Sequence, residues 1–241
     1  MNFSKISPFD TVVYFYSYFL ACPCHTDCLS GCHRCENPVC FLDSKLQLTR
    51  TSPSELVWND KGGGSKKDGS FWTVPRNQLT NGWKMLGETC CEQSNSVNTP
   101  CSSTILVKEN SGENILKQPV SVTQIWNDHG SHAKKDVAIY RLNPPSGYKC
   151  LGMVAVASHS TQPDLSKYRC VKNEYVHEVG LARVIWDDHG SHSKKDFTAY
   201  EYETTQDTVA MGTFYGANNY DYDEHLKFTI VHSIAKDKSY Q

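Results

Sequence analysis

The sequence predicts an all-β protein built from one structural unit repeated three times. A tryptophan-led segment occurs three times along the 241 residues. Between its copies, short apolar runs alternate with turns rich in Gly, Pro, Asn and Asp, at the spacing typical of strands. The 13 Tyr, 9 Phe and 5 Trp residues favour strands over helices, and we find no amphipathic helical window of useful length.

The repeated segment is clearest in the middle and last copies. Residues 125–141 read IWNDHGSHAKKDVAIYR, residues 185–201 read IWDDHGSHSKKDFTAYE, and a looser copy at 57–73 reads VWNDKGGGSKKDGSFWT. All three align without gaps as Trp-x-Asp-x-Gly-x-x-x-Lys-Lys-Asp. The leading residues Trp58, Trp126 and Trp186 are 68 and 60 positions apart (126 − 58 and 186 − 126). Such a period indicates a repeat architecture.

Each copy is expected to form four strands. In the middle copy they are 122–126, 136–142, 148–157 and 168–173; in the first, 55–59, 69–74, 83–89 and 104–109; in the third, 183–187, 197–203, 208–215 and 227–232. A single four-stranded sheet cannot bury its apolar face alone, whereas three sheets around one axis can. We therefore expect a β-prism with pseudo-threefold symmetry and three four-stranded sheets. A three-bladed propeller and a trefoil-like barrel are less favoured, since the units are long enough for whole sheets.

Three regions are expected along the chain. Residues 1–21 resemble a signal peptide, because Lys5 precedes an apolar run at 11–21 that is too short to span a bilayer. A buried strand, or the ragged start of a longer gene product, would explain the same run. Residues 22–44 form a cysteine-rich segment. Residues 45–241 form the prism, with repeats at about 52–110, 120–175 and 181–234.

Eleven cysteines are unevenly spread. Six lie in the cysteine-rich segment: Cys22, Cys24, Cys28, Cys32, Cys35 and Cys40. Such density favours disulfides formed in an oxidising compartment. Zinc is the alternative, because His25 and His33 lie among the thiols and Cys32-x-x-Cys35 has ligand spacing.

The other five cysteines are also candidates for disulfides. Cys90, Cys91 and Cys101 flank one loop of the first repeat, so a bridge across that loop is expected. Cys150 and Cys170 can pair if their strands lie opposite each other. Because five is odd, at least one thiol stays free or pairs with the cysteine-rich segment.

The repeated loop has an obvious structural role. Asp60, Asp128 and Asp188 can accept backbone N–H bonds as Asx-turns do, and Gly62, Gly130 and Gly190 supply positive φ. Asp68, Asp136 and Asp196 can hold the far side of the turn, while the tryptophans fill the core. The six aspartates also belong to the candidate ligand-binding set.

The cationic residues of the loop contribute little to turn geometry, and this makes them candidates for binding. Every copy carries a lysine pair: Lys66 and Lys67, Lys134 and Lys135, Lys194 and Lys195. Paired cations beside turn N–H groups can bind a phosphate or carboxylate head group. His129, His132, His189 and His192 would add positive charge in mild acid. Polar turn residues on a solvated face are the alternative for both sets.

The motif resembles a known family. Trp-x-Asp-x-Gly-Ser-x-x-Lys-Lys-Asp followed by Pro-Pro-x-Gly-Tyr-x-x-Leu-Gly is similar to the vacuolar protein sorting sixty-two family and to multivesicular-body-associated β-prism repeats. The match covers about 55–232. Gly63 and Gly64 replace Ser131 and His132 in the first copy, and the third lacks the Pro-Pro segment. The resemblance implies a β-prism that targets membranes or glycans, as such prisms do beside membrane-attack-complex/perforin proteins.

Composition and motifs exclude several function classes. The net charge of −2 provides no global basic field for nucleic acid. No hydrolase, metalloprotease, P-loop or dinucleotide motif occurs, so we expect no enzyme and no cofactor. The loops lack the oxygen-ligand density of a calcium loop, and no metal site is expected.

The expected function is a non-enzymatic recognition module that binds anionic membrane lipid head groups, outside the cell or in a lumen, linked to a pore-forming or defence function. A lectin is one alternative. An intracellular trafficking adaptor, peripheral on membranes and with a zinc-binding N-terminal segment, is the other.

Overall fold

The computed structural model describes residues 45–93, 100–204 and 209–221, together with the backbone of short strands at 34–36, 39–41 and 228–231. The expected signal peptide at 1–21 and four cysteines of the cysteine-rich segment lie outside the described residues. The all-β prediction is confirmed. Helical structure in the described residues is limited to three single 3-10 turns, Arg76–Gln78, Leu165–Lys167 and Asn173–Tyr175.

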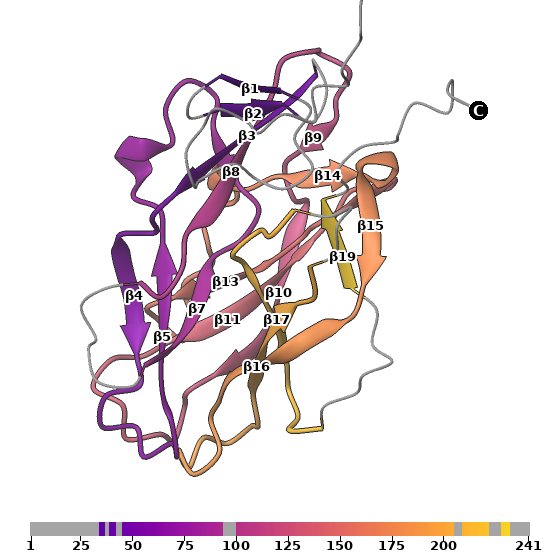
Figure 1. Ribbon diagram of the computed structural model, residues 1–241. Coiled ribbons are helices and arrows are strands. Elements are labelled where there is room, and N and C mark those ends of the chain that lie inside the picture. The colour runs from indigo at the N-terminus through magenta and orange to yellow at the C-terminus, as the bar shows by residue number, and fades with distance from the viewer. Residues whose placement is uncertain are drawn as a thin grey trace, which may run out of the picture.

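Three antiparallel sheets of three strands, one from each repeat, surround the tryptophans. Their strands are β4 (Glu55–Asn59), β5 (Asp68–Thr73) and β7 (Thr89–Gln93); β10 (Ser121–Asn127), β11 (Ala138–Asn143) and β13 (Met153–Val156); and β16 (Leu181–Asp187), β17 (Thr198–Tyr202) and β18 (Phe214–Ala217). In Figure 1 their first hairpins, β4–β5, β10–β11 and β16–β17, all turn at the lower end of the molecule.

A second set of sheets occupies the opposite end. One contains β1 (Arg34–Glu36), β2 (Val39–Phe41), β3 (Leu46–Thr51), β8 (Thr104–Glu109) and β6 (Lys84–Met85); another contains β12 (Tyr148–Lys149), β14 (Cys170–Lys172) and β9 (Leu116–Lys117); the last pairs β15 (Val176–Val179) with β19 (Phe228–Val231). Labelled members of all three lie in the upper part of Figure 1.

The expected four-stranded sheets are not observed, because the third strand bends out of its sheet. The run expected at 148–157 is divided into β12 and β13, with Leu151 and Gly152 between them. The third strand of the first repeat is divided in the same way into β6 and β7, with Gly87 between them. A Cβ on Gly87 would lie 2.7 Å from the Gly152 Cα, so only glycine allows the two bends to meet. In the first two repeats the fourth strand then pairs with the first half of the third, in the second set of sheets.

The sequence reasoning also missed the short leading strand of each repeat. β3, β9 and β15 precede their repeats and pair with the fourth strands β8, β14 and β19. The boundary expected at residue 45 is not a break in the sheet, because β2 pairs with β3. Part of the cysteine-rich segment therefore extends the sheet that contains β3 and β8. Whether its cysteines form disulfides or bind zinc lies outside the described side chains.

A bulge directs each tryptophan into the core. The pairing register shifts just before Trp58, Trp126 and Trp186, between strands one and two of every repeat. Such a bulge lets two successive side chains face the same side of a strand. Accordingly Ile185 and Trp186 are both buried, with 6% and 0% of their surfaces exposed.

The core has two main parts, which match the two sets of sheets. Aromatic residues dominate the part beneath the hairpins: Trp58, Trp126, Trp186, Phe71, Phe197 and Phe214. The ring centroids of Trp58 and Trp126 lie 5.6 and 6.0 Å from that of Trp186. Aliphatic residues fill the other part, among them Leu46, Leu48, Leu86, Ile105 and Leu151. The expected role of the tryptophans in the core is confirmed.

Two of the expected disulfides are present. Cys91 bonds to Cys101 across the loop of the first repeat, and Cys150 bonds to Cys170 between β12 and β14. Among the described side chains, Cys90 is the free thiol, and it is buried. Successive residues of β7 face opposite sides, which places Cys90 in the aromatic core and Cys91 toward the loop.

Candidate functional site

The three hairpin loops form a closed ring, which we call the loop rosette (residues 59–68, 127–136 and 187–196). Each indole N–H donates to the backbone carbonyl of the second lysine in another repeat. The bonds run from Trp58 to Lys135 (2.7 Å), from Trp126 to Lys195 (2.8 Å) and from Trp186 to Lys67 (2.8 Å). Because every repeat donates once and accepts once, the three repeats are related cyclically.

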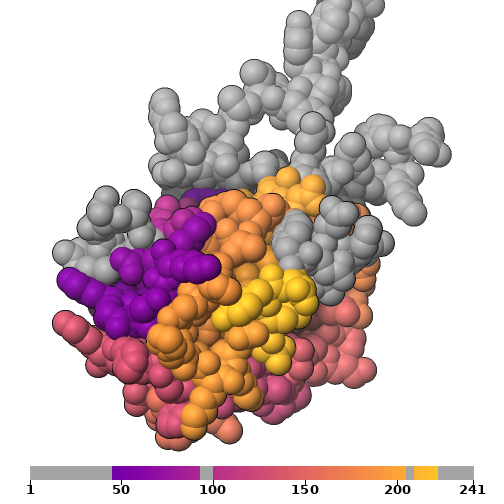
Figure 2. Space-filling view, turned by 90° about the horizontal axis from the view of Figure 1, so that it is seen from below, coloured from indigo at the N-terminus to yellow at the C-terminus, as the bar shows by residue number. Residues whose placement is uncertain are grey.

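Backbone contacts between neighbouring loops strengthen the ring. The Lys66 N–H donates to the His189 carbonyl at 3.0 Å, and the Lys194 N–H donates to the His129 carbonyl at 3.1 Å. Gly130 has φ of +100°, and a Cβ there would lie 3.1 Å from the His192 carbonyl. Seen from below in Figure 2, the indigo, pink and orange segments of the three repeats meet side by side.

The first aspartate of each loop faces inward. Asp128 and Asp188 are 4% and 1% exposed. Asp128 Oδ1 accepts the Val137 N–H at 2.9 Å, and Asp188 Oδ1 accepts the Phe197 N–H at 2.8 Å. Burial raises the pKa of Asp188, and the Phe197 bond partly opposes the rise. These carboxylates close the loop from beneath, so their contribution to the site is structural.

The Asx-turns are formed by a different residue from the one predicted. The side chain just before each of these aspartates accepts the N–H two positions on: Asn59 from Lys61 (3.2 Å), Asn127 from His129 (3.2 Å) and Asp187 from His189 (3.0 Å). The prediction had assigned this turn to Asp60, Asp128 and Asp188 and was wrong by one position. Asp128 and Asp188 bond across the loop instead, because they point into the protein.

Asp60 lacks the partners that its two counterparts have. Ser131 and Ser191 donate to Asp128 and Asp188, whereas the first repeat has Gly63 at this position. Asp60 Oδ2 is buried without a hydrogen-bond partner among the described residues. Burial, followed by repulsion from nearby aspartates, raises the pKa of Asp60 to about 6. The first loop therefore contains a carboxylate that takes up a proton in mild acid.

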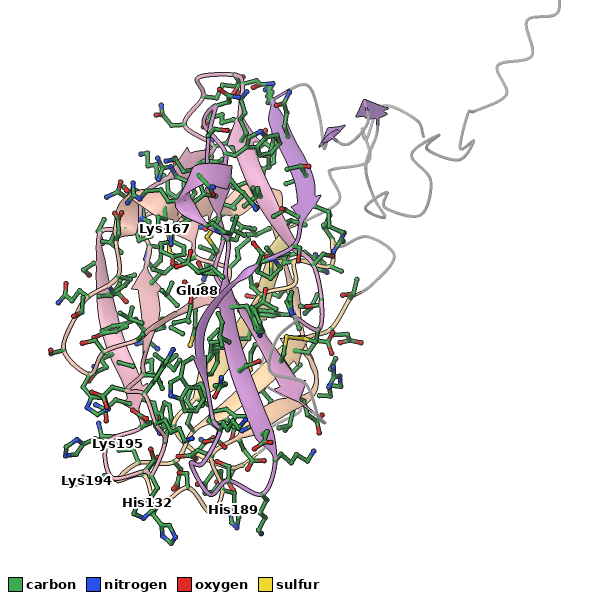
Figure 3. All side chains as sticks on the ribbon, turned by 90° about the vertical axis from the view of Figure 1, so that its left-hand side faces the viewer. Glu88, His132, Lys167, His189, Lys194 and Lys195 are labelled. Carbon is green, nitrogen blue, oxygen red and sulfur yellow. A yellow bond between two sulfur atoms is a disulfide. The ribbon has the colours of Figure 1, made fainter. Side chains whose placement is uncertain are left out.

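The predicted cationic residues all face solvent. The six paired lysines and the four loop histidines are exposed, as are the second aspartates Asp68, Asp136 and Asp196. Figure 3 shows His132, His189, Lys194 and Lys195 gathered at the loop end. The structure thus brings together on one surface residues that are up to 130 positions apart (196 − 66).

Two residues that the sequence reasoning missed lie against the rosette. His159 Nε2 is 2.6 Å from Asp128 Oδ1 and 3.7 Å from Asp136 Oδ1, and the Tyr220 hydroxyl donates to Asp188 Oδ1 at 2.8 Å. His159 lies three residues after the end of β13, and Tyr220 lies three residues after the end of β18. An alignment of the repeats could have revealed this correspondence.

Asp128, Asp136 and His159 present possible metal-ligand atoms within 4.8 Å of one another. The 2.6 Å bond from His159 and the Val137 N–H already occupy Asp128 Oδ1. These three side chains therefore form a hydrogen-bonded contact between the loop at 127–136 and the segment after β13.

A buried carboxylate joins the first and second repeats away from the rosette. Glu88 is 2% exposed; its oxygens accept the Tyr168 hydroxyl and the Ala155 N–H, both at 2.8 Å. It lines a hollow of about 280 Å³ whose rim includes Lys167. Figure 3 places both residues well above the loop end. Burial raises the pKa of Glu88 to about 7, despite the opposing bond from Tyr168.

The comparisons with known proteins agree with this architecture. A family profile described as vacuolar protein sorting-associated protein 62 (Vps62) matches residues 37–239. The chain belongs to the Vps62 family. The predicted resemblance is therefore confirmed, and the match spans the described sheets from β2 to β19.

A solved structure is similar to this Vps62-family chain: the crystal structure of GNIP1Aa from Chromobacterium piscinae. The TM-score is 0.61 at 28% sequence identity, over 72% of this chain and 33% of that chain. The matched part of this chain thus corresponds to about a third of GNIP1Aa. No match was found among curated proteins. Among the described residues, no helix is both long and apolar enough to cross a bilayer.

Proposed function

We propose that this Vps62-family chain is a non-enzymatic recognition module whose loop rosette binds anionic membrane lipid head groups. The observation that supports this most directly is the ring of indole-to-carbonyl bonds. It fixes the backbone of Lys67, Lys135 and Lys195 and leaves their side chains exposed. Three equivalent weak sites on one rigid surface bind a membrane with avidity. The β-prism interpretation is part of this proposal and rests on the cyclic relation of the repeats.

The distribution of charge supports an anionic ligand. The rosette contains seven lysines and seven aspartates, so its formal charge is zero when its histidines are neutral. Asp60, Asp128 and Asp188 are buried beneath the loops. The remaining groups are therefore seven exposed ammonium groups, Lys61 included, against four carboxylates. Near an anionic leaflet each such lysine contributes about 1 kcal/mol.

Mild acid would strengthen this binding. Burial raises the pKa of Asp60 to about 6, so its protonation in mild acid removes a negative charge from beneath the lysines. Four histidines are exposed on the same surface: His129, His132, His189 and His192. Their rings pack on other rings, His129 on His159, His132 on His192 and His189 on Tyr220. Loss of the Asp60 charge makes the rosette more positive.

The two disulfides support a location outside the cell or in a lumen, where such bonds persist. A structural relative such as GNIP1Aa, of which the matched region covers 33%, supports the idea that such a prism works beside another domain. Both points remain part of the proposal.

Vesicle flotation tests the proposal. We expect the chain to bind phosphatidylserine-containing vesicles more tightly than phosphatidylcholine vesicles, and more tightly at about pH 5 than at about pH 7.5. Replacing Lys134 and Lys135 by Ala should weaken binding by about 2 kcal/mol, or about 30-fold.

The matched control replaces Lys117 and Lys149 by Ala. Both are exposed on the sheet at the opposite end of the molecule, and the pair removes the same charge. Equal losses in the two double variants would contradict a role for the rosette. Binding that ignores phosphatidylserine but responds to glycans would identify the module as a lectin instead.

A further inference from the structure

A hollow of about 230 Å³ lies in the rosette at the junction of the first and third repeats. Lys66 and Lys67 line it from the first repeat, and Asp187, His189 and Tyr220 line it from the third. Val184 contributes an apolar wall. The volume corresponds to about eight waters of bulk liquid, the same order as a small phosphorylated head group.

Asp187 has a charge that its structural role does not require. The same position is Asn59 in the first repeat and Asn127 in the second. In all three repeats the side-chain Oδ1 accepts the N–H two residues on, at 3.0–3.2 Å. An amide therefore forms the turn as well as a carboxylate does. The negative charge occurs only in the copy that lines this hollow.

The two lysines across the hollow do not neutralise Asp187. Lys67 Nζ lies 3.2 Å from Glu92 Oε1, and within the described ranges no ion pair closer than 4.0 Å joins Asp187 to Lys66 or Lys67. Opposite charges thus line one small hollow without meeting. A ligand that carries both signs would complement both sides.

Tyr220 adds an aromatic ring to the carboxylate side. It is 39% exposed, one of two large apolar side chains that the described part of the chain exposes. Its hydroxyl donates to Asp188 at 2.8 Å, and its ring centroid is 5.0 Å from that of His189. These contacts hold the ring in place beside Asp187. A rigid aromatic ring next to a carboxylate is suited to an ammonium group.

We propose that this hollow binds a phosphoamine, a phosphate ester that carries a primary ammonium group, as in phosphoethanolamine and phosphoserine. Lys66 and Lys67 contact the phosphate, while Asp187 and the ring of Tyr220 contact the ammonium. The inference rests on the proposed function and adds one specific site to it. Phosphate alone would face repulsion from Asp187, and an amine alone would face two lysines.

The proposal is tested with soluble probes on the full chain, by following backbone amide shifts in NMR titrations. We expect O-phosphoethanolamine to bind about tenfold more tightly than inorganic phosphate or ethanolamine, from one exposed ion pair plus one cation–π contact. Asp187→Asn should reduce phosphoethanolamine binding to the level of phosphate. It should still fold, since it restores the residue of the other two repeats. Asn127→Asp is the matched control and should leave the preference unchanged.

Vesicles separate a lipid-borne ligand from a free one. If vesicles containing phosphatidylethanolamine or phosphatidylserine show the same loss with Asp187→Asn, the ligand is a head group. If only the soluble probe shows it, the site binds a free phosphoamine, and membrane binding is decided separately by the Lys134 and Lys135 double variant. Equal binding of phosphoethanolamine and phosphate, or no effect of Asp187→Asn while Lys134 and Lys135 still govern vesicle binding, overturns this inference alone.

Discussion

Glu88 offers a prediction whose size follows from the structure. Its folded-state pKa of about 7 exceeds the ordinary value of 4.5, so the folded protein binds this proton more tightly than the unfolded chain does. For a carboxyl group shifted in this direction, stability is highest at low pH and falls as pH rises from about 4.5 through about 7. The difference between pKa values of about 7 and 4.5 corresponds to a loss of about 3 kcal/mol.

Glu88→Gln should remove most of this loss. The amide keeps an acceptor for the Ala155 N–H and can donate to the Tyr168 oxygen, so both contacts survive. We expect the variant to be about 2–3 kcal/mol more stable than the wild type at about pH 8, allowing about 1 kcal/mol for imperfect hydrogen bonds. At about pH 4.5 the two proteins should differ by less than about 1 kcal/mol.

Urea unfolding followed by tryptophan fluorescence measures the difference, with the disulfides kept intact. The pH dependence of the wild-type free energy of unfolding includes contributions from every titrating group. The difference between variant and wild type isolates the contribution of position 88. Glu178→Gln, on the exposed edge of β15, is the control and should show a difference that does not change with pH. If the free-energy difference for Glu88→Gln is the same at both pH values, the carboxylate does not titrate as argued.

Three further predictions concern stability. Trp126→Phe should cost about 2–4 kcal/mol in urea unfolding, because the Lys195 carbonyl loses its donor and the smaller ring leaves a cavity. Gly152→Ala should cost at least about 1–3 kcal/mol, since its Cβ would lie 2.8 Å from the Thr213 Cβ. Asp60→Asn should stabilise the protein at about pH 8 and lose this advantage in acid, because burial raises the pKa of that carboxyl.

Each of these has an outcome that would contradict it. An unchanged midpoint for Trp126→Phe would show that the indole bond contributes nothing. An unchanged midpoint for Gly152→Ala would remove the packing explanation, because the added Cβ would have found room beside Thr213. For Asp60→Asn, lower stability at about pH 8 would mean that Asp60 has a partner that stabilises its charge.

The sequence was sufficient for the local features of the fold. The threefold motif located the hairpins and put Trp58, Trp126 and Trp186 in the core, and two expected strands, β4 and β8, match their observed bounds. Lysines beside a glycine-bearing turn were correctly expected to be exposed, because turn geometry makes no use of them. These properties depend on residues close together in the chain, whose preferences a repeat displays three times.

Contacts between repeats were decided only by the tertiary structure. The bend at Gly87 and Gly152, which divides the expected four-stranded sheets of the first and second repeats, occurs where two backbones touch. Asp187 shares a hollow with Lys66 although 121 residues separate them (187 − 66). A repeat indicates that its copies are alike, but it does not show which copy's side chains face the next. The indole-to-carbonyl bonds, which run from Trp58 to Lys135, from Trp126 to Lys195 and from Trp186 to Lys67, determine which repeats face each other.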